Sequence, residues 1–187
     1  MIPSGIFVKT QLEELLSSLP ARLIACGPSR LSITFGPDPS GEPGESFLSI
    51  SQWSDDLCLV EVAGSEDLTA LVVRSVAEHD PMEEVLSCHY KPEAGEFSYA
   101  LYREGRPLET FESRGPALET LNFTSELRRV PLQSILQASD FMIESLSHHG
   151  IEGGLESAVP EQKAILHVDL PGKKTFWQML LGAASWK

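Results

Sequence analysis

Basic residues are scarce in this chain of 187 residues. It carries 14 lysines and arginines against 27 aspartates and glutamates, for a formal net charge of −13 at pH 7. A nucleic-acid backbone would repel such a surface, so nucleic acid is not expected as a partner. The acidity is concentrated in residues 61–120, which hold 13 acids and 5 bases. If the protein has a charged partner, that partner is expected to be basic.

Cysteine is also sparse, and long apolar runs are absent. Cys26, Cys58 and Cys88 are an odd set at wide spacing, whereas a secreted protein of this size normally carries a denser, even set. The N-terminal residues lack a basic segment followed by an apolar one, so no secretory signal is predicted. No window of 18 residues is uninterruptedly apolar, so no membrane span and no membrane partner are predicted. Together these features predict reduced thiols in a protein of the cytoplasm.

The sequence patterns that usually carry metal, cofactor or catalytic chemistry are missing. Neither C-x-x-C nor H-x-x-x-H spacing occurs, and Cys88 and His89 would point to opposite faces of a predicted strand. No G-x-S-x-G turn presents a nucleophilic serine. Gly172-Lys173 resembles the end of a phosphate loop, but His167 stands where that loop needs its first glycine. We therefore assign no catalytic, cofactor-binding or metal-ligating residue.

Hydrophobic periodicity predicts an α+β fold with a mainly antiparallel sheet. Its centre is a three-stranded meander over about 85–113, with further strands at 22–26, 31–35, 47–53, 57–62 and 164–170. Helices are predicted near 10–19, 66–79, 131–149 and 175–184. Pro20 is expected to end the first helix and Pro131 to begin the third. The length suits a single domain over 1–187, with a weak division near 115–130.

Local signals at the ends of these elements sharpen the prediction. Thr10 and Glu13 have the spacing of a capping box at the start of the first helix. Ser65 is predicted to be the N-cap of the second helix. Gly150 followed by Ile151 predicts a left-handed cap after the third. The glycine- and proline-rich segment 36–45 is predicted to be a mobile loop outside the core.

The first candidate binding group combines an aromatic side chain with acids in the meander. Tyr102 is a candidate anchor, and Glu104, Glu109 and Glu112 are candidates for a field that attracts a basic protein. The alternative is that the meander's aromatic rings form the core face of the sheet. Because exposed charges contribute little to stability, replacing the three glutamates is predicted to leave the fold intact.

The second candidate group lies in the C-terminal segment. The predicted helix 175–184, which includes Trp177 and is followed by Trp186, is apolar around nearly its whole circumference. Such a helix must be buried, either in the protein's own core or against another chain. A homodimer joined through this helix therefore remains an alternative to core burial.

No family is identified from the sequence. The hairpin over 99–105 is loosely similar to those of small bacterial cytoplasmic proteins, including toxin-neutralising immunity proteins, and it transfers no residue role. The leading hypothesis is a non-catalytic binding or inhibitory module of the bacterial cytoplasm whose acidic face engages a basic protein. Two alternatives stay open: a small enzyme with a site assembled from dispersed residues such as Cys88, His89 or His167, and a homodimeric structural protein.

Overall fold

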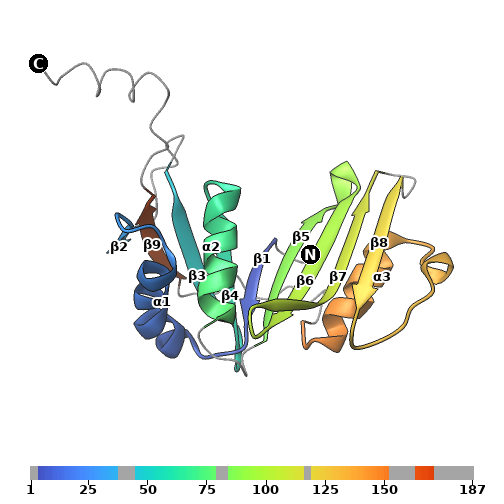
Figure 1. Cartoon of the computed structure of the whole chain (residues 1–187), viewed down its shortest axis with the longest axis horizontal. Helices are drawn as coiled ribbons and strands as arrows, with labels where there is room; N and C mark the ends of the chain where they lie inside the picture. Colours follow the sequence, from blue (N-terminus) through green and yellow to red (C-terminus); the bar gives the residue numbers. More distant parts are fainter. Residues whose placement is uncertain (1–3, 38–44, 79–83, 116–118, 152–162, 171–187) are drawn as a thin grey trace, which may run out of the picture.

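The computed structural model describes residues 4–37, 45–78, 84–115, 119–151 and 163–170. These segments form an α+β fold on one nine-stranded antiparallel sheet, in the order β2-β9-β3-β4-β1-β5-β6-β7-β8 (Figure 1). The strands are β1 (Gly5–Val8), β2 (Ser32–Gly36), β3 (Phe47–Ser54), β4 (Leu57–Ala63), β5 (Val85–Lys91), β6 (Glu96–Arg103), β7 (Arg106–Arg114), β8 (Thr120–Ser125) and β9 (Lys163–Asp169). The helices are α1 (Leu12–Cys26), α2 (Glu66–Ala77) and α3 (Ala138–His148), with 3-10 turns η1 (Pro92–Ala94) and η2 (Leu132–Ser134).

The predicted antiparallel meander is confirmed as β5, β6 and β7, which pair in sequence order. Phe97, Tyr99 and Leu101 share one face of β6, as strand alternation requires. The turn between β6 and β7 is Glu104-Gly105, and both residues have positive φ angles of 54° and 72°. Such a two-residue turn matches the right-handed twist of the strands that it joins.

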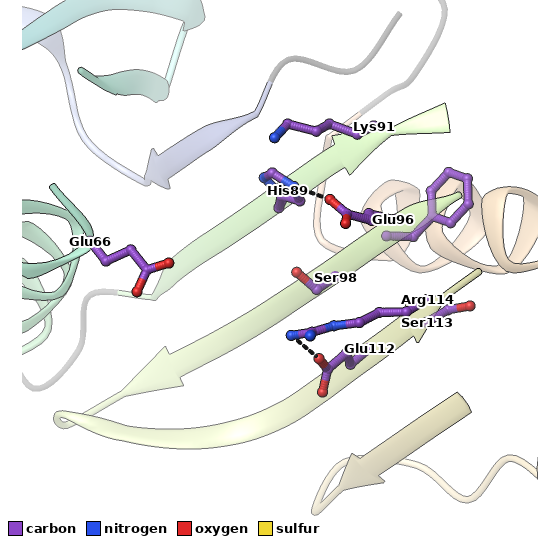
Figure 2. Close-up of a pocket in the computed structure, with 9 residues that line it drawn as sticks. Glu66, His89, Lys91, Glu96, Ser98, Glu112, Ser113 and Arg114 are labelled. Carbon is purple, nitrogen blue, oxygen red and sulfur yellow. Dashed lines mark ion pairs between the residues drawn. The ribbon is translucent and has the colours of Figure 1, made fainter. Parts of the chain in front are cut away.

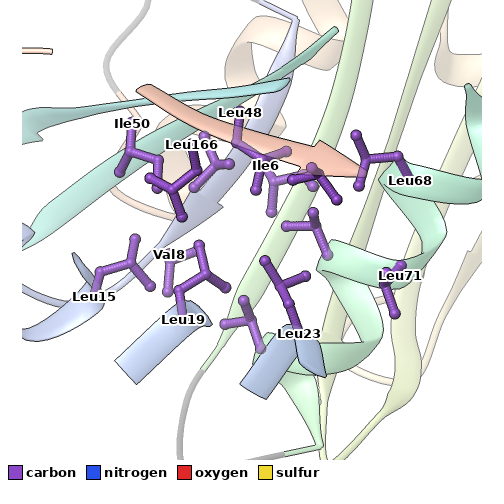
Figure 3. Packing of buried hydrophobic residues seen from close by; sticks show 14 of the residues in the cluster. Ile6, Val8, Leu15, Leu19, Leu23, Leu48, Ile50, Leu68, Leu71 and Leu166 are labelled. Carbon is purple, nitrogen blue, oxygen red and sulfur yellow. The ribbon is translucent and has the colours of Figure 1, made fainter. Parts of the chain in front are cut away.

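The helices cover opposite faces of the sheet at its two ends (Figure 1). α1 and α2 pack on one face, where Leu19 and Leu68 belong to the same buried cluster as Leu48 of β3 and Leu166 of β9 (Figure 3). α3 packs on the other face, where its buried residues join a cluster that includes Phe111 of β7. Burying one such side chain stabilises the fold by roughly 1.5–3 kcal/mol. Because α1 and α2 reach only as far as β5 and β6, no described helix covers their face of the sheet over β7 and β8.

α1 is longer than predicted, and Pro20 lies inside the helix instead of at its end. The helix continues to Cys26, so the predicted stop at Pro20 and the predicted strand at 22–26 are both wrong. An internal proline removes a hydrogen bond and costs about 3 kcal/mol or more. Leu19 and Leu23, both 0% exposed, lie on either side of Pro20 in the core and offset that cost. Tertiary packing has overridden the local signal.

The start of α1 is capped from another element. Gln11 is the N-cap residue and its side chain makes no capping bond, so the predicted capping box is not formed. Instead, the Leu12 N–H donates to Oε1 of Gln52 on β3, at 2.7 Å. The strand thereby satisfies one of the unpaired amides at the start of the helix.

The third predicted helix is divided. Of residues 131–149, only Ala138–His148 form α3, and Pro131 precedes the separate turn η2. Ile135 has extended backbone and is buried, whereas Leu136 is 84% exposed. The predicted left-handed cap is confirmed: Gly150 has φ 79°, and the N–H of buried Ile151 donates to the Leu146 carbonyl at 2.9 Å.

Two strands were not predicted, and some predictions fall outside the described residues. β1 lies in the middle of the sheet between β4 and β5, and β8 lies in the segment 115–130, where only a weak division was predicted. Residues 38–44 of the predicted loop, and the predicted helix 175–184 with Trp177 and Trp186, lie outside the described ranges. Within those ranges, no helix combines the length and apolar character needed to cross a membrane.

Candidate functional site

A polar hollow lies on the sheet face that continues beyond α2. Strand pairing aligns short side chains across β5 to β8 as its floor: Ser87, Ser98, Ala100, Thr110 and Asn122. One hollow of about 390 Å³ and a neighbouring one of about 280 Å³ share His89, Ser98 and Glu112, so they form a single depression. We call this depression the polar trough.

Charged and titratable side chains surround one end of the polar trough. They are Glu66, His89, Lys91, Glu96, Glu112 and Arg114 (Figure 2). Glu66 extends from the first turn of α2 toward the strands (Figure 2). Ser65, which precedes it, is the N-cap residue of α2 as predicted, although its side chain makes no capping hydrogen bond. The other five come from β5, β6 and β7. The trough therefore combines carboxylates from a helix and from a sheet that meet only in the folded chain.

The charged groups of the trough are already paired in part, and the pairs are exposed. Arg114 lies 2.7 Å from Glu112, and their side chains are 70% and 40% exposed. His89 Nε2 lies 3.6 Å from Glu96 Oε2. Exposed pairs of this kind contribute only about 0–1 kcal/mol. An incoming ligand ion can replace either partner at little cost.

The predicted binding residues are not brought together as one surface. Glu112 lines the polar trough, Glu104 is exposed at the β6–β7 turn, and Tyr102 is half-buried against the α1–α2 core. Glu109 lies on the opposite face and is only 1% exposed. The prediction that Glu109 belongs to an exposed acidic face is therefore wrong.

Glu109 instead accepts hydrogen bonds in a buried network beside α3. Tyr99 donates its hydroxyl at 2.6 Å and Ser125 at 2.7 Å. Arg128 approaches with Nε at 3.0 Å and Nη2 at 2.8 Å, and its Nη2 also donates to Ser145 at 2.6 Å. This two-pronged geometry is the strong form of an arginine–carboxylate pair. The network joins β6, β7, the end of β8 and α3.

The network sets the ionisation of its members. Burial alone would raise the pKa of Glu109, but hydrogen bonds from Arg128, Ser125 and Tyr99 and the charge of Arg128 lower it to about 2. Burial and the neighbouring carboxylate raise the pKa of Tyr99. The hydrogen bond to Glu109 raises the pKa of Arg128 against the opposing effect of burial. At neutral pH the network is thus a fixed ion pair with a neutral phenol, suited to structure rather than proton transfer.

The dispersed Cys and His residues of the alternative enzyme hypothesis also remain apart. Cys88 lies in the core on the α3 face, while His89 lines the polar trough on the other face. Three strands separate His167 on β9 from both. Burial raises the pKa of Cys88 to about 12 and that of Cys58 to about 11. Both thiols are therefore protonated near neutral pH and supply no nucleophilic thiolate there.

Metal binding finds no support in the described ranges, where no three His, Cys, Asp or Glu side chains are placed to hold an ion.

Comparison of the chain with protein-family models, with curated proteins and with solved structures gives no match. Function is therefore inferred from the chemistry of the polar trough itself.

Proposed function

We propose that the protein is a non-catalytic binding module whose polar trough holds a basic, extended segment of a partner protein. The observation that supports this proposal is the arrangement of Glu66, Glu96 and Glu112, which converge from α2 and the sheet on one open hollow. The net charge of −13 adds a long-range field that speeds the approach of a cationic partner.

The floor of the trough suits a polypeptide chain. Its side chains are short, so a peptide backbone can approach the sheet closely. The hydroxyls of Ser98 and Thr110 and the amide of Asn122 both donate and accept hydrogen bonds. These groups can serve the N–H and C=O groups of an extended segment, while the carboxylates select lysine or arginine side chains.

The positive groups in the trough are compatible with a basic ligand. Arg114 is 70% exposed, so a ligand arginine that takes its place at Glu112 leaves the displaced guanidinium in water. After this exchange Glu112 is paired with the ligand arginine instead of Arg114. The ligand gains in addition the hydrogen bonds that its peptide backbone makes in the trough. Specificity then comes from the spacing of the ligand's cations along the trough.

An inhibitory role and a cytoplasmic location belong to the same proposal. A module that covers a cationic working surface of another protein inhibits it by blocking access. Cys26, Cys58 and Cys88, which all lie in the described ranges, form no disulfide, and this suits a reducing compartment. The homodimer through helix 175–184, with Trp177 and Trp186, stays a prediction.

Peptide binding to charge-matched variants tests this function. Extended lysine- and arginine-rich peptides should bind the wild type, and E66Q/E112Q should weaken binding roughly tenfold, at up to about 1 kcal/mol for each lost pair. The control is E13Q/E144Q, which removes the same charge from exposed positions on α1 and α3. Equal weakening in both double variants would show that only net charge matters, and would refute binding in the trough.

A further inference from the structure

β8 is the last strand of the sheet in the described part of the chain (Figure 1). It pairs with β7, and no other described strand lies beyond it. Its sequence Thr-Leu-Asn-Phe-Thr-Ser has no charged residue and no proline, and its register with β7 is unbroken. Charges, prolines and bulges are the devices by which edge strands usually avoid pairing with another chain.

The chain leaves the strand direction after Ser125, and the turn η2 that follows contacts β8. The hydroxyl of Ser125 accepts hydrogen bonds from the N–H groups of Leu127 and Arg128, at 3.0 and 3.1 Å. Arg128 then lies on the α3 face, 5.5 Å from the centre of the Phe123 ring and 5.4 Å from that of Phe141. Within the described part of the chain, no backbone hydrogen bond joins residues 126–137 to β8. Among the described residues, the segment 126–137 therefore does not occupy the outward N–H and C=O groups of β8 with its own backbone.

Exposed apolar side chains lie in the segment that follows this edge. Leu127, Leu132 and Leu136 are 51%, 42% and 84% exposed, and η2, which contains Leu132, contacts β8. An exposed apolar side chain beside a strand edge can add apolar burial to backbone pairing there. Leu132, on the turn that contacts β8, is placed to do so.

We propose that two copies of the chain associate through β8, antiparallel about a two-fold axis at Asn122. In an antiparallel pair, residues that lie opposite each other point to the same face of the sheet. A two-fold axis between two copies of one strand must therefore pass through a position where a residue faces the same residue of the other copy. With Asn122 at the axis, Leu121 lies opposite Phe123 of the partner copy on the apolar face. Thr120 lies opposite Thr124 on the polar face, and Glu119 opposite Ser125, so no like charges meet. Aliphatic–aromatic cross-strand pairs of this kind stabilise sheets.

The charge distribution favours a second copy over a basic partner at this edge. β8 itself is neutral, and the acid of the neighbouring network, Glu109, is already paired with Arg128. Two copies with a net charge of −13 each repel at long range, and salt screens that repulsion. Association through β8 should therefore strengthen with ionic strength, whereas binding of a basic segment in the trough should weaken.

Pairing through β8 would also complete the polar trough. Asn122 lines the trough at its open side, which is the free edge of β8. A second copy continues the floor with its own β8, so that one depression runs between the two α2 helices. The association does not depend on the trough's ligand, and it stands if the proposed function fails.

Sedimentation equilibrium of the full chain over a range of concentrations and salt tests this inference. The wild type should dimerise, more tightly as salt rises. N122K places two lysines opposite each other and should weaken the dimer roughly tenfold or more. Mixing N122K with N122D should restore a heterodimer, because the opposed charges then attract. The control T34K adds the same charge to β2, the other edge strand, where Thr34 is also exposed, and should leave the dimer unchanged.

Circular dichroism and thermal melting of each variant establish that it is folded. A wild type that stays monomeric up to millimolar concentration would overturn the proposal. A dimer that N122K weakens no more than T34K would also overturn it and place the contact elsewhere, for example in the segment 175–184 that the sequence predicts to be helical. Dimerisation that weakens as salt rises would contradict the predicted neutral interface.

Discussion

Replacing Glu109 by glutamine should destabilise the folded protein by about 3 kcal/mol at neutral pH. The magnitude follows from the buried network. The folded pKa of Glu109 is about 2, against an ordinary value of 4.5. That difference is worth about 3 kcal/mol for the ionised form, at 1.36 kcal/mol per pKa unit. It agrees with the roughly 3–5 kcal/mol lost when one partner of a buried pair is removed.

The same network predicts the pH dependence. Because the pKa of Glu109 is lower in the folded state, its contribution is complete above about pH 4.5 and disappears as the pH falls toward 2. The free energy of unfolding, measured by urea titration at several pH values, should therefore differ between wild type and E109Q by about 3 kcal/mol at pH 7. The difference should shrink toward zero near pH 2. Other carboxylates titrate in both proteins, so their effects cancel in the comparison.

E112Q is the matched control for this experiment. Glu112 lies on the same strand but faces the polar trough, where its exposed pair with Arg114 contributes no more than about 1 kcal/mol. An E109Q variant that loses no more stability than E112Q would refute the structural role of the network. A difference that does not change with pH would refute the ionisation on which the magnitude rests.

Two further predictions concern the thiols and the cap of α1. Cys58 and Cys88 should react slowly with an alkylating reagent near neutral pH, because burial raises their pKa values to about 11 and 12; site-resolved mass spectrometry should find half-buried Cys26 labelled first. Fast labelling of Cys88 would contradict its placement in the core. Q52A should lower the free energy of unfolding by about 1 kcal/mol, since it removes the acceptor of the Leu12 N–H. No change in a urea titration would show that water replaces this cap without loss.

The meander and the second helix could be predicted because their signals are local. Alternation placed Phe97, Tyr99 and Leu101 on one face, and the Glu104-Gly105 turn joined the strands as expected. The prediction that Pro20 ends the first helix was wrong. Whether a proline ends a helix depends on the core contacts of the neighbouring residues, and the local sequence pattern does not contain these contacts. β1 has only four residues, and its central place depends on pairing with β4 and β5, far along the chain.

The candidate site could be predicted only in part. Glu109 and Glu112 are three residues apart on one strand, so alternation itself puts them on opposite faces, with Glu109 beside buried Phe111. The polar trough could not be found in this way, because Glu66 lies 21 residues before Ser87 and 56 residues before Asn122, the nearest and the farthest trough residues in the sequence. Its assembly depends on the tertiary packing of α2 against the sheet.

Binding in the polar trough is tested most directly by mapping where a basic peptide binds. Amide chemical shifts of the labelled full chain can be followed while an extended lysine- and arginine-rich peptide is added. We expect the largest changes at Ser98, Glu112 and Asn122 and their neighbours on β6 to β8, with an affinity that falls as salt rises. Changes spread evenly over exposed acids, or centred on α1 or α3, would contradict binding in the trough.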